Sequence, residues 1–149
     1  MNIRQATEKD IDVIADLTRQ LFKLYSSIDI HYDNFDSEED YVELKKFLRE
    51  GFSKHYFLIA YDGDSPVGFL QGDILSKKNH KIGFVRNVFV LETSRKLGVG
   101  KEMIQDFFQY CKKQGADRVE LISDVRSDAY AFWAKSGFTP ITHRMKLDI

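Results

Sequence analysis

This sequence of 149 residues lacks the features that mark several classes of protein. Its single cysteine, Cys111, allows no disulfide within the chain, and we expect it to be a small apolar residue on a helix face rather than a reactive thiol. No apolar run approaches the roughly 18 residues of a membrane span. Residues 1–8 have no apolar signal region, so we expect a cytoplasmic protein that does not associate with membranes.

Charges of both signs are balanced and dispersed. Lys and Arg total 22 against 23 Asp and Glu, and the basic residues are scattered, so we expect no nucleic acid as a partner. The four histidines lie far apart without ligand spacing, so we expect no metal site. Apolar residues make up 43% of the chain, which at this length predicts one globular domain over residues 1–149.

The periodicity of apolar residues predicts an alternation of helices and strands. Strands are expected at residues 2–5, 56–61, 66–74, 82–91, 118–123 and 138–147, and helices at residues 7–24, 37–52, 98–114 and 127–136. Residues 62–65 are a turn signal, which predicts a hairpin. The order β-α-α-β-β-β-α-β-α-β predicts an α/β (mixed α+β) fold, with a central mixed, mostly antiparallel sheet flanked by helices.

The most informative segment runs from residue 88 to residue 101. Val88–Leu91 is apolar throughout, which predicts a strand buried on both faces. A short loop with Gly98 and Gly100 follows and leads into an amphipathic helix. Glycine lets a ligand approach the backbone, and the first N–H groups of a helix lack an internal partner and lie at the positive end of its dipole. The segment therefore predicts a site for phosphate or pyrophosphate.

Two other phosphate-binding motifs do not match this loop. A Walker loop requires Gly-Lys-Ser/Thr, but Gly100-Lys101 is followed by Glu102, and Arg95 occupies the place of the first glycine. The dinucleotide fingerprint requires a third glycine where this chain has Met103. A strand–helix connection whose glycines only allow close packing remains the alternative.

The sequence Arg95-Lys96-Leu97-Gly98-Val99-Gly100 resembles the Arg/Gln-x-x-Gly-x-Gly/Ala signature of the GNAT N-acetyltransferase superfamily. Three further segments resemble that family in the same order along the chain. They are Thr7–Asp10, the hairpin segment Pro66–Leu70 after Gly63, and Ala129–Phe138. The resemblance therefore spans almost the whole chain.

The resemblance implies an N-acetyltransferase that transfers an acetyl group from acetyl-CoA directly to a primary amine while both substrates are bound. It implies that acetyl-CoA, the cosubstrate, binds along the exposed strand backbone and the loop amides. The residues so implied are Val88, Phe89, Val90, Arg95, Lys96, Leu97, Gly98, Val99, Gly100 and Lys101. The resemblance also leaves a homodimer open.

Catalytic roles are expected for residues near the end of the same strand. The resemblance implies that the backbone N–H of Val90 stabilises the oxyanion formed on the thioester carbonyl. Glu92, just beyond the strand, is the first candidate for the general base and Asp124 is the second. A solvent-exposed position for Glu92 and a helix-capping role for Asp124 are the alternatives. The sequence does not show on which face of the sheet Asn87 and Asp73 lie.

Two departures from the family pattern concern the cosubstrate and its leaving group. Trp133 stands where the family often has a tyrosine that protonates the departing thiolate, and an indole is not a practical proton source. Tyr130, one helical turn earlier, is the candidate to replace it. Alternatively no acid is needed, because a thiol with a pKa of about 8.5 is a tolerable leaving group. Arg126 stands where Asn is common, and it either reaches acetyl-CoA or faces solvent.

The acceptor is expected between the first two helices and residues 25–36. Several acidic residues in this region favour a small cationic amine such as a polyamine or aminoglycoside, while a protein amine and a merely solvated surface stay open. The main alternative function is an acyl-CoA-binding domain without efficient transfer, which Trp133 favours. A nucleotide-binding protein of another class is the third possibility.

Overall fold

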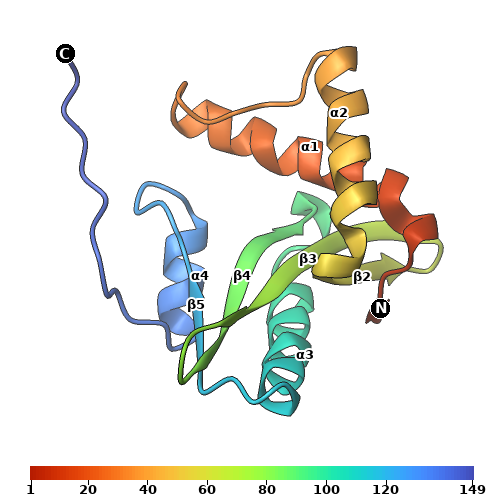
Figure 1. Ribbon diagram of the computed structural model, residues 1–149. Coiled ribbons are helices and arrows are strands. Elements are labelled where there is room, and N and C mark those ends of the chain that lie inside the picture. The colour runs from red at the N-terminus through yellow and green to blue at the C-terminus, as the bar shows by residue number, and fades with distance from the viewer.

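A five-stranded sheet in the order β1-β2-β3-β4-β5 forms the centre of the protein (Figure 1). The computed structural model describes all residues from 1 to 149. The first four strands pair antiparallel and β5 pairs parallel to β4, so the sheet is mixed and mostly antiparallel, as predicted. The strands are β1 (Asn2–Gln5), β2 (Tyr56–Asp62), β3 (Ser65–Ser76), β4 (Lys81–Val90) and β5 (Arg118–Leu121).

Helices cover both faces of this sheet. The α1 and α2 helices lie on one face, and α3 lies on the other (Figure 1). The expected helices are confirmed to within a few residues at their ends, and none is both long and apolar enough to cross a lipid bilayer. The helical elements are η1 (Glu8–Asp10), α1 (Ile11–Ile28), α2 (Glu38–Gly51), η2 (Phe52–Lys54), η3 (Glu92–Ser94), α3 (Val99–Lys113) and α4 (Ala129–Lys135).

Side chains that alternate along β2 show why both faces need a helical layer. Phe57 and Ile59 pack with α1 and α2, whereas Leu58 and Ala60 pack with α3. All four residues are at most 2% exposed. Cys111 belongs to the α3 core and is buried, which confirms its expected place as a small apolar residue, and burial raises the pKa of its thiol to about 11.

A β-bulge in β4 puts Arg86 on the same face of the sheet as its neighbour Asn87. Gln71 of β3 pairs with Asn87, but the next residue of β3 pairs with Val85, so Arg86 is an extra residue in β4. Because of this insertion, Arg86 and Asn87 both bond to side chains of β3, Arg86 to Asp73 and Asn87 to Gln71. Asn87 and Asp73 both lie on the side of α1 and α2, because they alternate in step with Phe89 and Phe69, which belong to that core.

β4 has a free edge over its second half. It pairs with β5 only at residues 82–85 and continues to Val90 without a neighbour on that side. The N–H of Leu91 donates to the carbonyl of Val67 at 2.8 Å, which makes these two residues a hydrogen-bonded pair. Since hydrogen-bonded pairs alternate in an antiparallel ladder, the N–H groups of Val88 and Val90 point away from β3, into the gap beside β4.

The prediction that Val88–Leu91 is buried on both faces is wrong. Of these four residues only Phe89 is buried, and the other three are half-buried. The reason is that β5 ends before it reaches this part of β4, so one edge of the apolar run remains open.

The strand predicted at residues 138–147 is also absent. Residues 139–149 have no regular structure and run past α4, away from the sheet (Figure 1). The apolar side chains of Ile141, Met145 and Leu147 are 65%, 89% and 86% exposed. Their period-two spacing favours a strand, but a strand also needs hydrogen-bonded neighbours, and no part of this chain pairs with the segment.

Candidate functional site

The loop between β4 and α3 has the backbone geometry of an anion-binding site. Gly98 has φ +85° and Lys96 has φ +65°, so two left-handed residues precede α3. The first helical hydrogen bond runs from the N–H of Glu102 to the carbonyl of Gly98 at 2.9 Å, and the N–H groups of residues 98–101 have no backbone acceptor. These free donors lie at the positive end of the α3 dipole, where a phosphate group is stabilised.

Arg95 connects this loop to the end of β4. Its Nε donates to the carbonyl oxygen of Val90 at 3.0 Å, and its guanidinium carbon lies 6.0 Å from the centre of the Phe89 ring. This hydrogen bond uses one of the five N–H groups of Arg95 and leaves the others free. Lys96 and Lys101 are exposed, as is Arg95, so the loop carries three accessible cations.

Gly100 lies where α3, α4 and β4 meet. A β-carbon at this position would lie 3.6 Å from the ring of Phe132 and 3.8 Å from Cγ2 of Val90, which are ordinary van der Waals distances. Gly98, in contrast, needs glycine because its φ is positive. The free donors of α3 and the free edge of β4 therefore lie next to each other, with Phe132 beside both.

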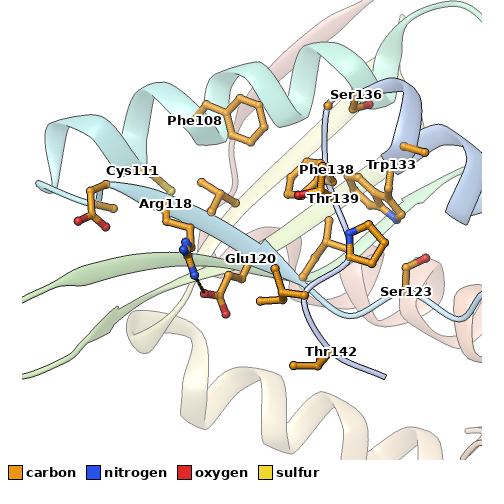
Figure 2. A pocket seen from close by; sticks show the side chains of 18 of the residues that line it. Phe108, Cys111, Arg118, Glu120, Ser123, Trp133, Ser136, Phe138, Thr139 and Thr142 are labelled. Carbon is orange, nitrogen blue, oxygen red and sulfur yellow. Dashed lines mark hydrogen bonds and ion pairs between the residues drawn. The ribbon is translucent and has the colours of Figure 1, made fainter. Parts of the chain in front are cut away.

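Tyr130 and Trp133 line a cleft of about 590 Å³ between α3, β5, α4 and the carboxyl-terminal segment (Figure 2). Trp133 is 9% exposed and packs edge to face against two phenylalanines, so it is a core residue. Tyr130 shares its side of α4, but it lies two positions from Phe132, which faces the glycine loop. Residues two apart on a helix point in nearly opposite directions, so the structure does not bring Tyr130 to Val90.

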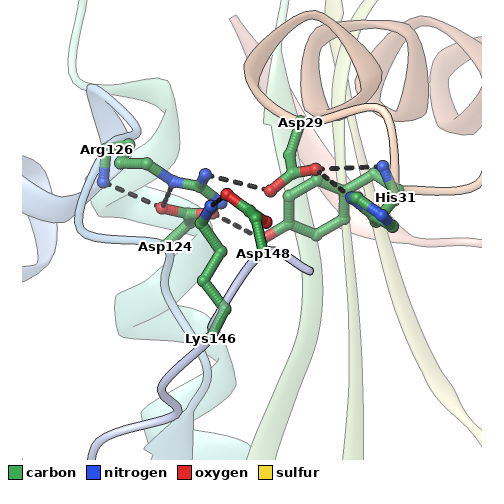
Figure 3. Close-up of polar contacts among 7 residues, drawn as sticks. Asp29, His31, Asp124, Arg126, Lys146 and Asp148 are labelled. Atoms are coloured by element: carbon green, nitrogen blue, oxygen red, sulfur yellow. Dashed lines mark hydrogen bonds and ion pairs between the residues drawn. The ribbon is translucent and has the colours of Figure 1, made fainter.

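The two candidate bases lie in different surroundings. Glu92 is exposed in η3, and its carboxylate has no hydrogen-bond or ion-pair partner. Asp124 accepts hydrogen bonds from Nε and Nη2 of Arg126 at 2.9 and 2.7 Å, and from the hydroxyl of Tyr32 at 2.7 Å (Figure 3). The bonds from Arg126, together with that from Tyr32, hold the pKa of Asp124 well below its usual range, which makes it a weak base.

Asp73 is likewise engaged by other side chains. It is 6% exposed, and its two carboxylate oxygens bond to Nδ1 of His55 and to Nε of Arg86. Because both oxygens are occupied, the carboxylate is held as a structural partner of the bulge rather than as a free base.

A pocket of about 370 Å³, here called the acceptor pocket, lies between α1, α2 and the sheet. Phe22 of α1, Phe35 of the α1–α2 connection and Phe47 of α2 supply aromatic surface. Asp40 and Glu43 of α2 add two carboxylates. The sequence predicts the acceptor site in this region.

Two amide side chains of the sheet also line the acceptor pocket. Nδ2 of Asn87 donates to Oε1 of Gln71 at 3.0 Å, and Gln71 is 7% exposed. Asn87 precedes Val90 by three residues, so the pocket and the free edge of β4 share one strand. The sequence leaves the facing of Asn87 open and does not single out Gln71, because alternation shows which residues share a face of a strand but not which helices cover that face.

Comparison with known proteins assigns the chain to one family. Residues 18–138 match the model of the Acetyltransferase (GNAT) family. An uncharacterised N-acetyltransferase of Methanocaldococcus jannaschii is 28% identical over 140 residues, which cover 91% of this chain and 59% of that protein. The chain thus spans less than two thirds of the length of this relative.

Solved structures of low sequence identity share the fold. A mutant of the BH1408 protein from Bacillus halodurans superposes with a TM-score of 0.83 at 21% identity, covering 100% of this chain and 99% of the other. An aminoglycoside acetyltransferase from an uncultured soil metagenomic sample, in complex with sisomicin, superposes with a TM-score of 0.73 at 18% identity, covering 99% and 95%. At this level of identity, the similar structures show a shared fold only. The family assignment rests on the sequence match, which covers most of the chain. The chain belongs to the GNAT acetyltransferase family.

Proposed function

We propose that this chain is an N-acetyltransferase that transfers an acetyl group from acetyl-CoA to a small cationic amine. The observation that carries the proposal is the arrangement along β4. The free edge at Val88 and Val90 adjoins the free donors of α3, and the acceptor pocket is lined by Asn87 of the same strand. A donor site and an acceptor site therefore lie within a few residues of each other.

The residues around the glycine loop fit the cosubstrate. The free N–H groups of residues 98–101 and the exposed cations Arg95, Lys96 and Lys101 suit a pyrophosphate. The free edge at Val88 suits an arm that contains amides, because such an arm can bond to the strand as an added strand would. When bound, acetyl-CoA supplies the acetyl group and a thiolate leaving group.

Val90 would stabilise the charge that develops during transfer. Its N–H points into the gap beside β4 and has no partner in the protein. One donor of this kind contributes about 3 kcal/mol to the stabilisation of an oxyanion. Because the ladder with β3 holds the strand, the direction of this N–H is set before a substrate binds.

The acceptor pocket suits a small amine with positive charge. Asp40 and Glu43 attract cations, and the aromatic side chains offer apolar and cation–π contacts. A volume of about 370 Å³ lies within the range of small-molecule sites, which favours a small amine over a protein segment. The likeness to an aminoglycoside acetyltransferase adds support for a cationic acceptor.

Glu92 is our candidate for the base that removes a proton from the bound ammonium, directly or through water. It comes immediately after Leu91 and has no partner, whereas Asp73 and Asp124 are each engaged by an arginine. We expect Glu92→Gln to lower kcat on the order of 100-fold and to leave the affinity for acetyl-CoA unchanged. An unchanged kcat would remove Glu92 from the mechanism.

In this proposal the thiolate leaves without a side-chain acid. Trp133 is buried and is not a proton source, and Tyr130 lies on the other side of α4 from the glycine loop. A thiol pKa of about 8.5 makes the thiolate a tolerable leaving group at neutral pH. We therefore expect Tyr130→Phe to retain turnover, and a loss on the order of 100-fold would restore Tyr130 as the acid.

The first experiment measures thermal unfolding of the protein with acetyl-CoA, with ATP and NAD as controls. Stabilisation by acetyl-CoA alone is expected, because a ligand that binds only the native state raises its stability. Release of CoA thiol in the presence of a panel of polyamines, aminoglycosides and lysine peptides then identifies the acceptor. No shift at millimolar acetyl-CoA contradicts the proposal.

A second candidate function is acyl-CoA binding without efficient transfer. The buried Trp133, which stands where the resemblance places a tyrosine, is the observation that favours it. Stabilisation by acetyl-CoA without thiol release for any amine in the panel would establish this function instead.

A further inference from the structure

Arg126 connects two loops that lie far apart in the sequence. Its Nη1 donates to Oδ2 of Asp29 at 2.9 Å, across 97 positions. Its Nε and Nη2 donate to the two carboxylate oxygens of Asp124, at 2.9 and 2.7 Å (Figure 3). At least three of its five N–H groups are thus engaged by the protein itself, and they join the segment after β5 to the connection between α1 and α2.

The α1–α2 connection, residues 29–37, is held at this point by a second link. The hydroxyl of Tyr32 donates to Asp124 at 2.7 Å, and the ring of Tyr32 lies 5.3 Å from that of Tyr25 in α1. Asp29 also accepts from the backbone N–H of His31 at 3.0 Å and contacts its Nδ1 at 2.8 Å. The first part of the connection is therefore ordered by hydrogen bonds that converge on Asp29 and Asp124.

The same connection supplies part of the acceptor pocket. Three residues after Tyr32, the ring of Phe35 packs edge to face against Phe22 at 5.0 Å, and both rings line the pocket with Asn87 of β4. The connection therefore reaches from a pocket on β4 to Asp124, which follows β5. The connection thus bridges β4 and β5 in the region where these two strands no longer pair.

We infer that Arg126 is a positioning residue, which fixes the Phe35 side of the acceptor pocket by anchoring residues 29–37 to the segment after β5. The role of the pocket itself rests on the proposed function, whereas the anchoring does not. An anchored connection presents Phe35 in one place and so selects amines that fit beside it. A released connection leaves the pocket without a fixed side, and bound amine must then order the connection at a cost in affinity.

Hydrogen–deuterium exchange tests the anchoring without any substrate. The variants are Arg126→Gln and Asp29→Asn, and the matched control is Arg118→Gln. Arg118 also bonds to a carboxylate two positions away, Glu120 at 3.3 Å, but it makes no bond to the α1–α2 connection. We expect about tenfold faster exchange over residues 29–37 in both variants and no change in the control. Unchanged exchange in Arg126→Gln would overturn the inference.

Steady-state kinetics with the amine that the wild type acetylates best tests the effect on the pocket. Arg126→Gln and Asp29→Asn are each expected to raise KM for the amine about tenfold, with kcat and KM for acetyl-CoA within about twofold of wild type. The double variant is expected to resemble the single variants, because both substitutions remove the same hydrogen bond between Arg126 and Asp29.

A different kinetic pattern would contradict the positioning role. A rise in KM for acetyl-CoA in Arg126→Gln that Asp29→Asn does not share would mean that Arg126 binds the cosubstrate. If the wild type acetylates no amine, the proposed function fails, and the exchange experiment still decides whether Arg126 anchors the connection.

Discussion

The Nε of Arg95 donates to the carbonyl oxygen of Val90 at 3.0 Å, so the first residue of the glycine loop folds back onto the last residue of β4. This one contact joins the two parts of the proposed acetyl-CoA site. It aligns a cation with the free amides of α3, and it bonds to the residue whose N–H is proposed to stabilise the oxyanion.

Replacing Arg95 with Met tests this contact. We expect the dissociation constant for acetyl-CoA to rise about tenfold, because hydrogen bonds to charged groups are worth roughly 1.5–3 kcal/mol. The midpoint of thermal unfolding should barely change, since the side chain is exposed. Isothermal titration calorimetry gives the constant. Lys113→Met, at the far end of α3, is the control and should bind as the wild type does; equal affinities of the two variants would contradict the assignment.

The two glycines of the loop should respond differently to alanine. Gly98→Ala places a β-carbon at φ +85°, which costs about 1 kcal/mol or more and disturbs the free amides. Gly100→Ala meets only ordinary contacts and lies inside α3, so its stability should be equal to that of the wild type or higher.

Thermal unfolding with and without acetyl-CoA measures both effects. Gly98→Ala should unfold a few degrees lower and show a smaller shift with the ligand. Gly100→Ala should keep both the midpoint and the shift. If both variants lose the shift, a β-carbon at Gly100 obstructs the ligand although it meets only ordinary contacts within the protein.

The carboxylates of the acceptor pocket should determine its preference for charge. Asp40→Asn and Glu43→Gln are expected to raise KM for a diamine several-fold and to change KM for a monoamine less, because each removes one favourable charge interaction. Glu39→Gln in the same helical turn does not line the pocket and is the control. A uniform effect of all three variants would point to the net charge of α2 rather than to the pocket.

The ion pair between Arg4 and Asp10 should make stability depend on pH. Both oxygens of Asp10 accept from Arg4 at 2.8 Å, one also accepts from the N–H of Thr7 at 2.8 Å, and the residue is 6% exposed. The bonds from Arg4 hold the pKa of Asp10 well below its usual range. Since the folded pKa is below the unfolded value of about 3.9, this stabilisation is present above about pH 4 and declines as the pH falls further.

Urea unfolding of Asp10→Asn at several pH values checks this dependence. At pH 7 the variant should lose about 1–3 kcal/mol of the free energy of unfolding, because an amide cannot accept the paired bonds from Arg4. Below about pH 4 the difference from wild type should shrink. Asp62→Asn, at the exposed end of β2, should show no difference at either pH. A difference that does not change with pH would mean that packing rather than charge stabilises this site.

Much of the proposed acetyl-CoA site could be predicted because it is contiguous in the sequence. An apolar strand end, two glycines and the start of an amphipathic helix lie between residues 88 and 101. Each of these signals acts locally: Gly98 permits a positive φ, and Val99, Met103 and Phe107 recur at helical spacing on the buried face of α3. The same local signals predicted the helices and the hairpin that the structure has.

The proposed acceptor site depends on contacts between distant residues. Asn87 lines the pocket because it shares a face of β4 with Phe89, and α1 and α2 cover that face. Arg86 reaches the same face because it is an extra residue in the ladder, and the register of a ladder is a property of two strands rather than one. Arg126 has its partner at Asp29, 97 positions away, and nothing local to Arg126 indicates that distance. The separation of β4 from β5 beyond residue 85 is likewise decided by where two strands meet and part.

The carboxyl-terminal segment separates the two kinds of information most clearly. By itself, the sequence determined that residues 145–149 alternate between apolar and polar side chains, as a strand does. Only the tertiary structure decided that no strand forms there, as it decided which polar groups line the pocket on β4. The physical reason is that spacing sets which faces a segment can present, whereas hydrogen-bonded neighbours and packing decide which of those faces is used.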